Sequence, residues 1–271
     1  MKDVKEQKIA VPLSFGDSDR NAILNGIKIA SIFRKELCLL YNYNKKEEAD
    51  IEHLSARLEE YTLPIKNEIP GFPVSTLLVS EQISELPDKL ADDYEVILFV
   101  VPFSGYKHYS KALAESPVPF LFINENNNHI SLFKNVILSI DQRKENSDSS
   151  LWTSYFGRFN DSKIIVLAAN DTSKEESNLV GKNIYQVKKL FQKFRIPHKI
   201  YKGEKSSLGN TFESLELALS SNCDLLIILG SSNITPLDWV VGLPERKIID
   251  NAGAIPVLIV NPRKDNYILC D

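Results

Sequence analysis

The chain has 271 residues, of which 43% are hydrophobic and 25% charged, and its formal net charge is −4 at pH 7. This is an ordinary globular composition, and the length fits one large domain or two of ordinary size. The acidic balance argues against nucleic-acid and anionic-membrane partners. The N-terminus has no apolar signal region and no apolar run is long enough to span a membrane, so we expect a cytoplasmic protein.

The first half alternates short apolar runs with helical patterns. Strand-like runs occupy residues 9–13, 37–41, 74–79, 96–101 and 118–123. Apolar side chains spaced three or four apart predict two helices between these runs, one carrying Ile23, Ile27 and Ala30 and one carrying Ile51, Leu54, Leu58 and Tyr61. A further short helix is predicted over residues 81–90.

The second half shows the same alternation more clearly. Strands are predicted over residues 136–140, 164–168, 198–202, 225–229 and 255–260, and helices over 146–160 and 245–251. Two amphipathic helices lie between them, one carrying Val180, Ile184, Val187, Phe191 and Phe194 and the other Leu208, Phe212, Leu215 and Leu219. Continuously apolar strands separated by amphipathic helices predict a parallel sheet covered on both faces.

The two halves are copies of one another. Glu95 begins an apolar run that returns 129 residues later at Asp224, and the run at Lys8 returns 127 residues later at Asn135. The closing strands, aligned at Pro119 and Pro256, are 137 residues apart, so the second copy has about eight extra residues before its last strand. We therefore predict two domains, 1–128 and 129–271, each a doubly wound five-stranded parallel sheet, with a polar connector near residues 124–128. An extra loop in one copy is where function is sought.

The order of features in the second half carries a family resemblance. A strand ends at Asp141, Gly230 follows the fourth strand directly, and a helix precedes a closing strand, Pro256-Val257-Leu258-Ile259-Val260. The chain resembles a tandem member of the universal stress protein family over nearly its whole length. The resemblance implies two flavodoxin-like (adenine nucleotide alpha hydrolase-like) domains, packed as an intrachain pseudo-dimer.

The resemblance also implies a nucleotide site in the second domain. Nucleotide-binding members have a loop of the form G-x-x-G, nine residues, then G-[S/T], whose backbone amides attract phosphates. Gly230 matches the first glycine, whereas Asn233 replaces the second, Gly242 comes one residue early, and Leu243 and Pro244 replace the final pair. The candidate site for ATP or another adenine nucleotide comprises Asp141, Ala168, Gly230, Ser231, Ser232, Asn233 and Gly242.

The first domain departs further from this pattern. Ser14 stands where the second half has Asp141, and Val101-Pro102-Phe103-Ser104-Gly105 replaces the glycine loop in a segment that is too short. We therefore expect no phosphate site in the first domain.

Simpler structural roles compete with these assignments. Asp141 can equally start the next helix, and Gly230 can serve only as a turn after a buried strand. No catalytic motif is present, and the four histidines lack metal-ligand spacing. We expect a stress-response regulatory protein that is a non-catalytic scaffold without a metal; the alternative is an ATP-binding protein that uses the C-terminal domain, with slow hydrolysis as a further variant.

Overall fold

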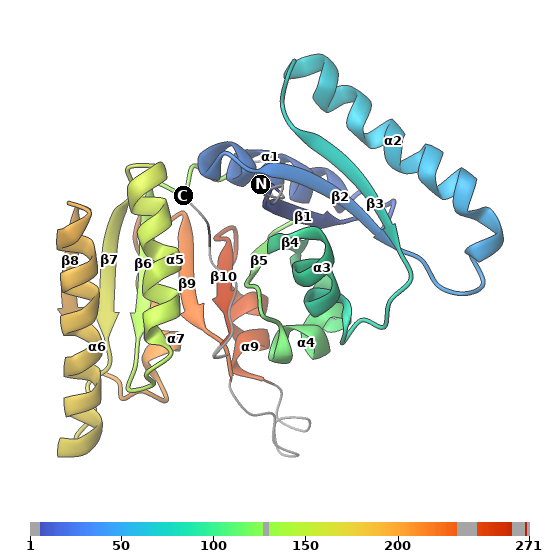
Figure 1. Cartoon of the computed structure of the whole chain (residues 1–271). Helices are drawn as coiled ribbons and strands as arrows, with labels where there is room; N and C mark the ends of the chain where they lie inside the picture. The colour runs from blue at the N-terminus through green and yellow to red at the C-terminus, as the bar shows by residue number, and fades with distance from the viewer. Residues whose placement is uncertain (1–5, 127–129, 232–242, 262–268, 270–271) are drawn as a thin grey trace. The chain divides into compact units, whose positions relative to one another are not determined.

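Parallel strands and the helices between them fill both halves of the chain in the computed structural model (Figure 1). The structure describes residues 6–126, 130–231, 243–261 and 269. The chain divides into two units, the first comprising Met1–Ile130 with Tyr267–Asp271 and the second Ser131–Asn266. This division falls two residues after the predicted boundary between 128 and 129.

The first unit has five parallel strands in the order β3-β2-β1-β4-β5. The strands are β1 (Lys8–Pro12), β2 (Glu36–Asn42), β3 (Val74–Val79), β4 (Val96–Pro102) and β5 (Phe120–Ile123). The helices are α1 (Asp19–Phe33), α2 (Ile51–Glu68), α3 (Leu86–Tyr94) and α4 (Tyr106–Glu115), with short 3-10 turns η1 (Glu48–Asp50) and η2 (Phe103–Gly105). The strand order reverses between β1 and β4.

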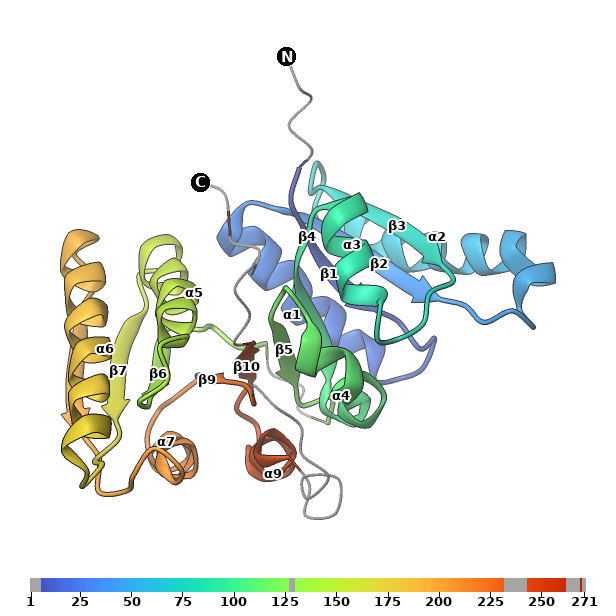
Figure 2. The same cartoon turned by 60° about the horizontal axis from the view of Figure 1, so that its bottom comes forward.

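The second unit repeats this arrangement, with the order β8-β7-β6-β9-β10. Its strands are β6 (Asn135–Ile140), β7 (Lys163–Ala168), β8 (His198–Lys202), β9 (Leu225–Leu229) and β10 (Val257–Val260). Its helices are α5 (Asn146–Phe159), α6 (Lys174–Lys193), α7 (Asn210–Leu219) and α9 (Pro244–Asn251). Figure 2 shows α5 and α6 on one face of this sheet and α7 and α9 on the other.

Burial explains why the predicted patterns fold in this way. The side chains of β4 from Val96 to Val101 and of β9 are buried along their whole lengths, as expected for strands with helices on both faces. On α6, Val187 and Phe191 are buried while Tyr185 on the opposite side is 68% exposed. The same helix begins with a reciprocal cap, because Ser173 Oγ accepts from the Glu176 amide at 3.2 Å and donates to its carboxylate at 2.8 Å.

The predicted fold class is confirmed, with local differences. Helix α3 begins at Leu86, later than predicted, since the residues before it form a turn. Helix α4 occupies a segment for which the pattern predicted no element. Its buried residues Tyr106, Ala112 and Leu113 form a stripe too short to stand out from the sequence alone. Among the described residues, none of the helices combines the length and apolar character needed to cross a membrane.

Two glycines on adjacent helices of the second unit provide a matched test of the packing. A Cβ added at Gly157 on α5 would lie 2.5 Å from Cγ2 of Ile196, a buried, β-branched side chain, whereas one added at Gly181 on α6 meets nothing within 4 Å. We expect Gly157→Ala to lower the free energy of unfolding by about 1–3 kcal/mol through overpacking. Gly181→Ala should raise it by about 0.5–1 kcal/mol, because alanine favours the helix.

Urea denaturation followed by circular dichroism measures both changes. Equal effects of the two substitutions would contradict the close packing of α5 against Ile196.

Candidate functional site

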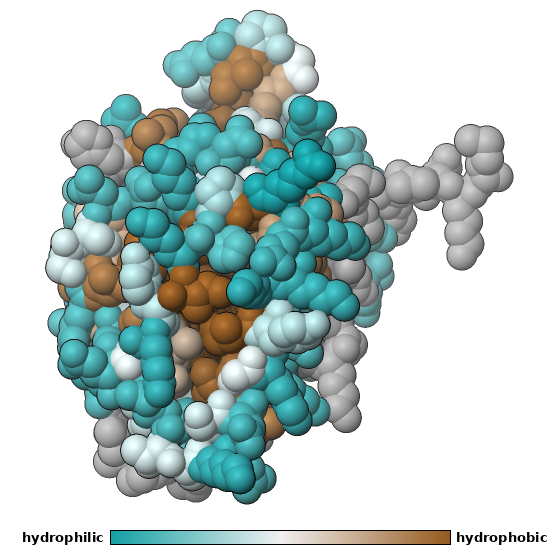
Figure 3. Space-filling model, turned by 90° about the vertical axis from the view of Figure 1, so that its left-hand side faces the viewer, coloured by the Kyte–Doolittle hydropathy of each residue, from teal (hydrophilic) through white to brown (hydrophobic). Residues whose placement is uncertain are grey.

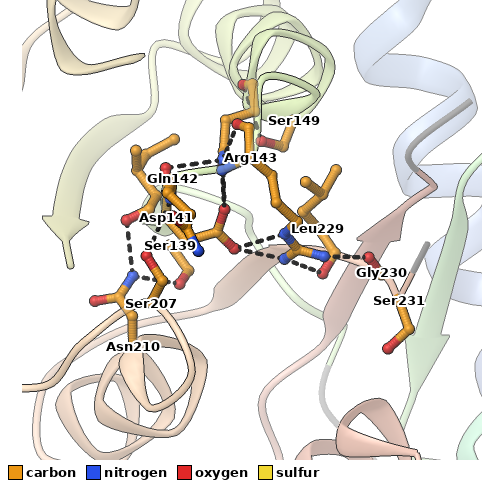
Figure 4. Close-up of polar contacts among 12 residues, drawn as sticks. Ser139, Asp141, Gln142, Arg143, Ser149, Ser207, Asn210, Leu229, Gly230 and Ser231 are labelled. Carbon is orange, nitrogen blue, oxygen red and sulfur yellow. Dashed lines mark hydrogen bonds and ion pairs between the residues drawn. The ribbon is translucent and has the colours of Figure 1, made fainter. Parts of the chain in front are cut away.

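The candidate site lies at the carboxyl end of the second sheet, where strand order reverses between β6 and β9. Ligands of doubly wound sheets bind at such a switch point. A hollow of about 230 Å³ opens there, and the polar side chains that line it include Asp141, Arg143, Ser207, Thr211 and Glu245. Figure 4 shows the contacts around Asp141 and Arg143.

Both carboxylate oxygens of Asp141 are already bound within the protein. Oδ1 accepts from the Arg143 backbone amide at 2.8 Å and from Asn146 Nδ2 at 2.8 Å. Oδ2 accepts from Arg143 Nε at 2.9 Å and from Nη2 at 2.5 Å. The Asp141 side chain is only 8% exposed, so this charge-assisted pair is partly desolvated and geometrically fixed.

The guanidinium of Arg143 continues from Asp141 to the end of β9. Its Nη1 donates to the carbonyl of Gly230 at 2.6 Å, and Nη2 donates to the carbonyl of Leu229 at 3.2 Å. A carbonyl at a strand end has left the hydrogen-bond ladder and needs another donor. Arg143 supplies that donor, and Asp141 compensates its charge (Figure 4).

Buried asparagine side chains likewise donate hydrogen bonds to neighbouring backbone carbonyls. Asn183 Nδ2, from α6, donates to the carbonyls of Asp141 and Arg143, each at 2.8 Å. Asn210 Nδ2, at the start of α7, donates to Ser139 Oγ at 2.9 Å and to the carbonyl of Ile140 at 3.0 Å. These amides hold the end of β6 against the helices on both faces of the sheet.

Ala168 and Gly230 occupy strand ends whose backbone groups are engaged. The carbonyl of Ala168 accepts from the Gly203 amide at 2.7 Å, and the Gly230 amide donates to the carbonyl of Val260 at 2.8 Å. A Cβ at position 230 would lie 3.1 Å from both Asn261 Oδ1 and Ile259 Cγ2. A larger residue at this position would need both side chains to move by a few tenths of an ångström, so packing gives the glycine a structural role.

Ser231 begins the predicted phosphate loop, and its backbone amide donates to a carboxylate oxygen of Glu245. Glu245 follows Pro244, the first residue of α9, and is 4% exposed. Its other oxygen, Oε2, is buried without a hydrogen-bond partner among the residues that the structure describes. The backbone amide that would be the first phosphate donor of the loop therefore already donates to an internal carboxylate. Ser232, Asn233 and Gly242 lie outside the described residues.

Similarity to solved structures is found across the whole fold. A universal stress protein from Archaeoglobus fulgidus DSM 4304 matches with a TM-score of 0.69 and 12% identity, covering 96% of this chain and 97% of that one. A functionally unknown protein, PA1789 from Pseudomonas aeruginosa PAO1, matches with a TM-score of 0.59 and 13% identity, covering 95% and 93%. No protein-family model and no curated protein matches the sequence.

This chain has the universal stress protein fold. The match over nearly the full length of both chains agrees with the resemblance that Asp141, Gly230 and the closing strand indicated.

The first unit of this universal stress protein fold places a different carboxylate at the end of its first strand. Ser14 occupies the position of Asp141, and its amide and hydroxyl donate to Asp19, at 3.0 and 2.9 Å. The Gly16 amide donates to the same carboxylate at 3.2 Å. Asp19 is 1% exposed, so the amides of Ser14 and Gly16 have an internal acceptor.

Sequence reasoning missed Arg143, Glu245 and Ser207. Ser207 Oγ accepts from the Gln142 amide at 3.1 Å and donates to Asp171 at 2.5 Å, which ties the loop after β8 to the site. Arg143 had a detectable signal, an opposite charge two residues from Asp141 after a strand. Among the described residues, no cluster of histidine, cysteine and acidic side chains suits a metal.

Removing the carboxylate of Asp141 tests whether it holds the strand ends together. We expect Asp141→Ala to lower the free energy of unfolding by about 1–3 kcal/mol, since it removes the carboxylate that accepts from Arg143 and Asn146 and leaves the guanidinium charge uncompensated. The control is Asp250→Ala, which removes an exposed pair with Arg246 and should change stability by less than about 0.5 kcal/mol.

A double variant distinguishes the loss of the Asp141–Arg143 ion pair from a non-specific destabilisation of the fold. Adding Arg143→Met to Asp141→Ala should recover part of the loss, because the uncompensated charge is also removed. Equal urea midpoints for Asp141→Ala and Asp250→Ala would show that the pair does not support the fold.

Proposed function

We propose that this protein is a regulatory, non-catalytic scaffold of the universal stress protein type, and that it acts through binding partners. The single observation that carries the proposal is the internal carboxylate of Glu245 on the Ser231 amide, at the start of the candidate phosphate loop. The pairing of the two units as an intrachain pseudo-dimer is part of the same proposal.

The charges around the hollow favour the scaffold over a nucleotide receptor. Helix N-termini and glycine loops bind phosphate through amides that lack a partner, but here Glu245 lies in the first turn of α9 and accepts from Ser231. A phosphate about 4 Å from that carboxylate would be repelled by about 4 kcal/mol at an effective dielectric constant of about 20, roughly a thousandfold in affinity.

The engagement of Asp141 adds to this disadvantage. A ligand that used this carboxylate would have to displace hydrogen bonds from Arg143 and Asn146. Displacing the guanidinium would also remove the donor of the Gly230 carbonyl. Binding energy would therefore be spent on breaking an existing network.

Binding of ATP or another adenine nucleotide is the second candidate. The hollow beside Asp141 supports it, because the lining residues Ser207, Thr211 and Ser231 all carry hydroxyl groups at the switch point of the sheet. Nucleotide binding would require the Glu245 carboxylate to leave the Ser231 amide. Slow ATP hydrolysis is a variant of this candidate.

Thermal melting with millimolar ATP and magnesium distinguishes the two candidates. A ligand at about 100 times its dissociation constant adds about 2.7 kcal/mol of stability. We expect no rise in Tm for the unaltered protein. Glu245→Gln keeps an acceptor for Ser231 but removes the buried charge, so ATP should now raise its Tm.

Glu216→Gln on α7 is the matched control, because it makes the same change in net charge at an exposed pair with Lys205. An ATP-dependent rise in the unaltered protein that Asp141→Ala abolishes would establish the nucleotide candidate. Phosphate release that scales with protein and disappears in the same variant would contradict a non-catalytic role.

A further inference from the structure

A second hollow of the second unit lies at the opposite end of its sheet from the candidate site. This groove encloses about 530 Å³ and crosses the N-terminal ends of β6, β7 and β8. One wall is the turn between α7 and β9, which contributes Ser221, Asn222 and Cys223. Its volume falls in the range of small-molecule sites, about 300–1,000 Å³.

The floor of the groove is apolar. In the strand register, Ile137 of β6 lies beside Ile165 of β7, so both side chains point to the same face of the sheet. Ser139 lies two residues after Ile137 and contacts Asn210 of α7, which identifies this as the α7 face. Ile165 is half-buried and lines the groove, whereas Ile137 is 1% exposed and lies beneath the surface. Figure 3 shows a hydrophobic hollow framed by hydrophilic side chains on the side of the second unit that carries β8.

The wall at Cys223 keeps this end of the groove uncharged. Burial raises the pKa of the Cys223 thiol to about 11, so it stays protonated at neutral pH. The next residue, Asp224, does not line the groove, and its carboxylate accepts from the backbone amides of Lys134 and Asn135 at 2.9 and 2.7 Å.

The charged side chains that line the groove are cationic. Lys163 precedes Ile165 on the same face of β7, and Lys199 of β8 lies beside Ile165 in the register. Both lysines are exposed, and among the described residues neither ammonium group has an ion pair or hydrogen-bond partner. No acidic residue is among the described residues that line the groove.

At the equivalent positions of the first unit, a lysine is paired with a carboxylate of the same unit. The repeat places Lys8, Glu36 and Ser75 where the second unit has Asn135, Lys163 and Lys199. Lys8 Nζ donates to Glu36 at 2.9 Å, and Ser75 donates to the same carboxylate oxygen. The second unit has two cations and no acid at these positions, so it lacks the anion that completes the first unit.

We propose that this groove is a binding site for a small amphipathic organic anion, an apolar chain or ring with a carboxylate. The apolar body would lie over Ile165, which is half-buried, and the carboxylate would lie between the Lys163 and Lys199 ammonium groups. Lys199, on the edge strand β8, would also discourage aggregation. That role does not apply to Lys163 on the inner strand β7, and it does not explain the apolar floor beside the two lysines. The proposal is independent of any ligand at the carboxyl end of the sheet.

Octanoate and its neutral analogue 1-octanol are the probes, with calorimetry on the full chain. We expect octanoate to bind at one site roughly tenfold more tightly than octanol, and added salt to reduce this preference. The double variant Lys163→Gln/Lys199→Gln should bind octanoate only as tightly as octanol. The control Lys188→Gln/Lys189→Gln, on the exposed side of α6, should leave both affinities unchanged.

A second variant tests the floor independently of charge. Ile165→Thr keeps a β-branched side chain in the strand but places a hydroxyl in the groove, so it should weaken octanoate and octanol alike by several-fold. In ¹⁵N-labelled protein, octanoate should shift amide resonances of Ile165 and Cys223. Melting temperatures of all variants verify that they are folded.

Several outcomes would overturn the proposal. These are the absence of saturable octanoate binding, equal affinity for octanol in the unaltered protein, or resonance shifts confined to another region. Sedimentation that shows self-association, lost in the Lys163→Gln/Lys199→Gln variant, would instead assign the groove to a second copy of the chain.

Discussion

The guanidinium of Arg143 joins the ends of two neighbouring strands, and the candidate site depends on this one group. It donates to carbonyls of β9 while Asp141, at the end of β6, compensates its charge. At a switch point the chain leaves the sheet in two directions, so the last carbonyls of each strand need donors from elsewhere. A bound ligand or an internal side chain can supply them, and here the side chain does. The arrangement of the site therefore follows from the need to give its own backbone carbonyls hydrogen-bond donors.

The two units meet the same requirement with different residues. After β1, Asp19 reaches back from the start of α1 to the amides of Ser14 and Gly16. After β6, the carboxylate is Asp141 itself, and a cation completes the arrangement. In both units an internal carboxylate accepts from backbone amides of the loop after the first strand, those of Ser14 and Gly16 in the first unit and that of Arg143 in the second. Both copies of the repeat thus place a carboxylate beside the loop after the first strand, but the residue that supplies it stands at a different position in each copy.

The sequence predicted the regular elements well because burial imposes periodicity on them. The stripe on α6 and the apolar strands follow directly from helices that cover both faces of a parallel sheet. The site was less accessible, since the contacts of Arg143 with Gly230 and of Glu245 with Ser231 join residues 87 and 14 positions apart. No local pattern encodes such pairs. Asn183 and Asn210 were missed for the same reason, because each is a buried polar residue in an amphipathic helix whose hydrogen-bond partners, at or just after the end of β6, are far away in the sequence.

The difference between Glu36 and Lys163, at equivalent positions of the repeat, has a consequence for how such chains diverge. In a homodimer of single units every substitution appears twice, so a change that benefits one copy must be tolerated by the other. Joining two copies in one polypeptide removes this restriction. One unit can keep the internal Lys8–Glu36 pair for stability, while the other exposes Lys163 and Lys199 at the positions equivalent to Glu36 and Ser75. Covalent fusion thereby turns a symmetric surface into two that are free to specialise separately.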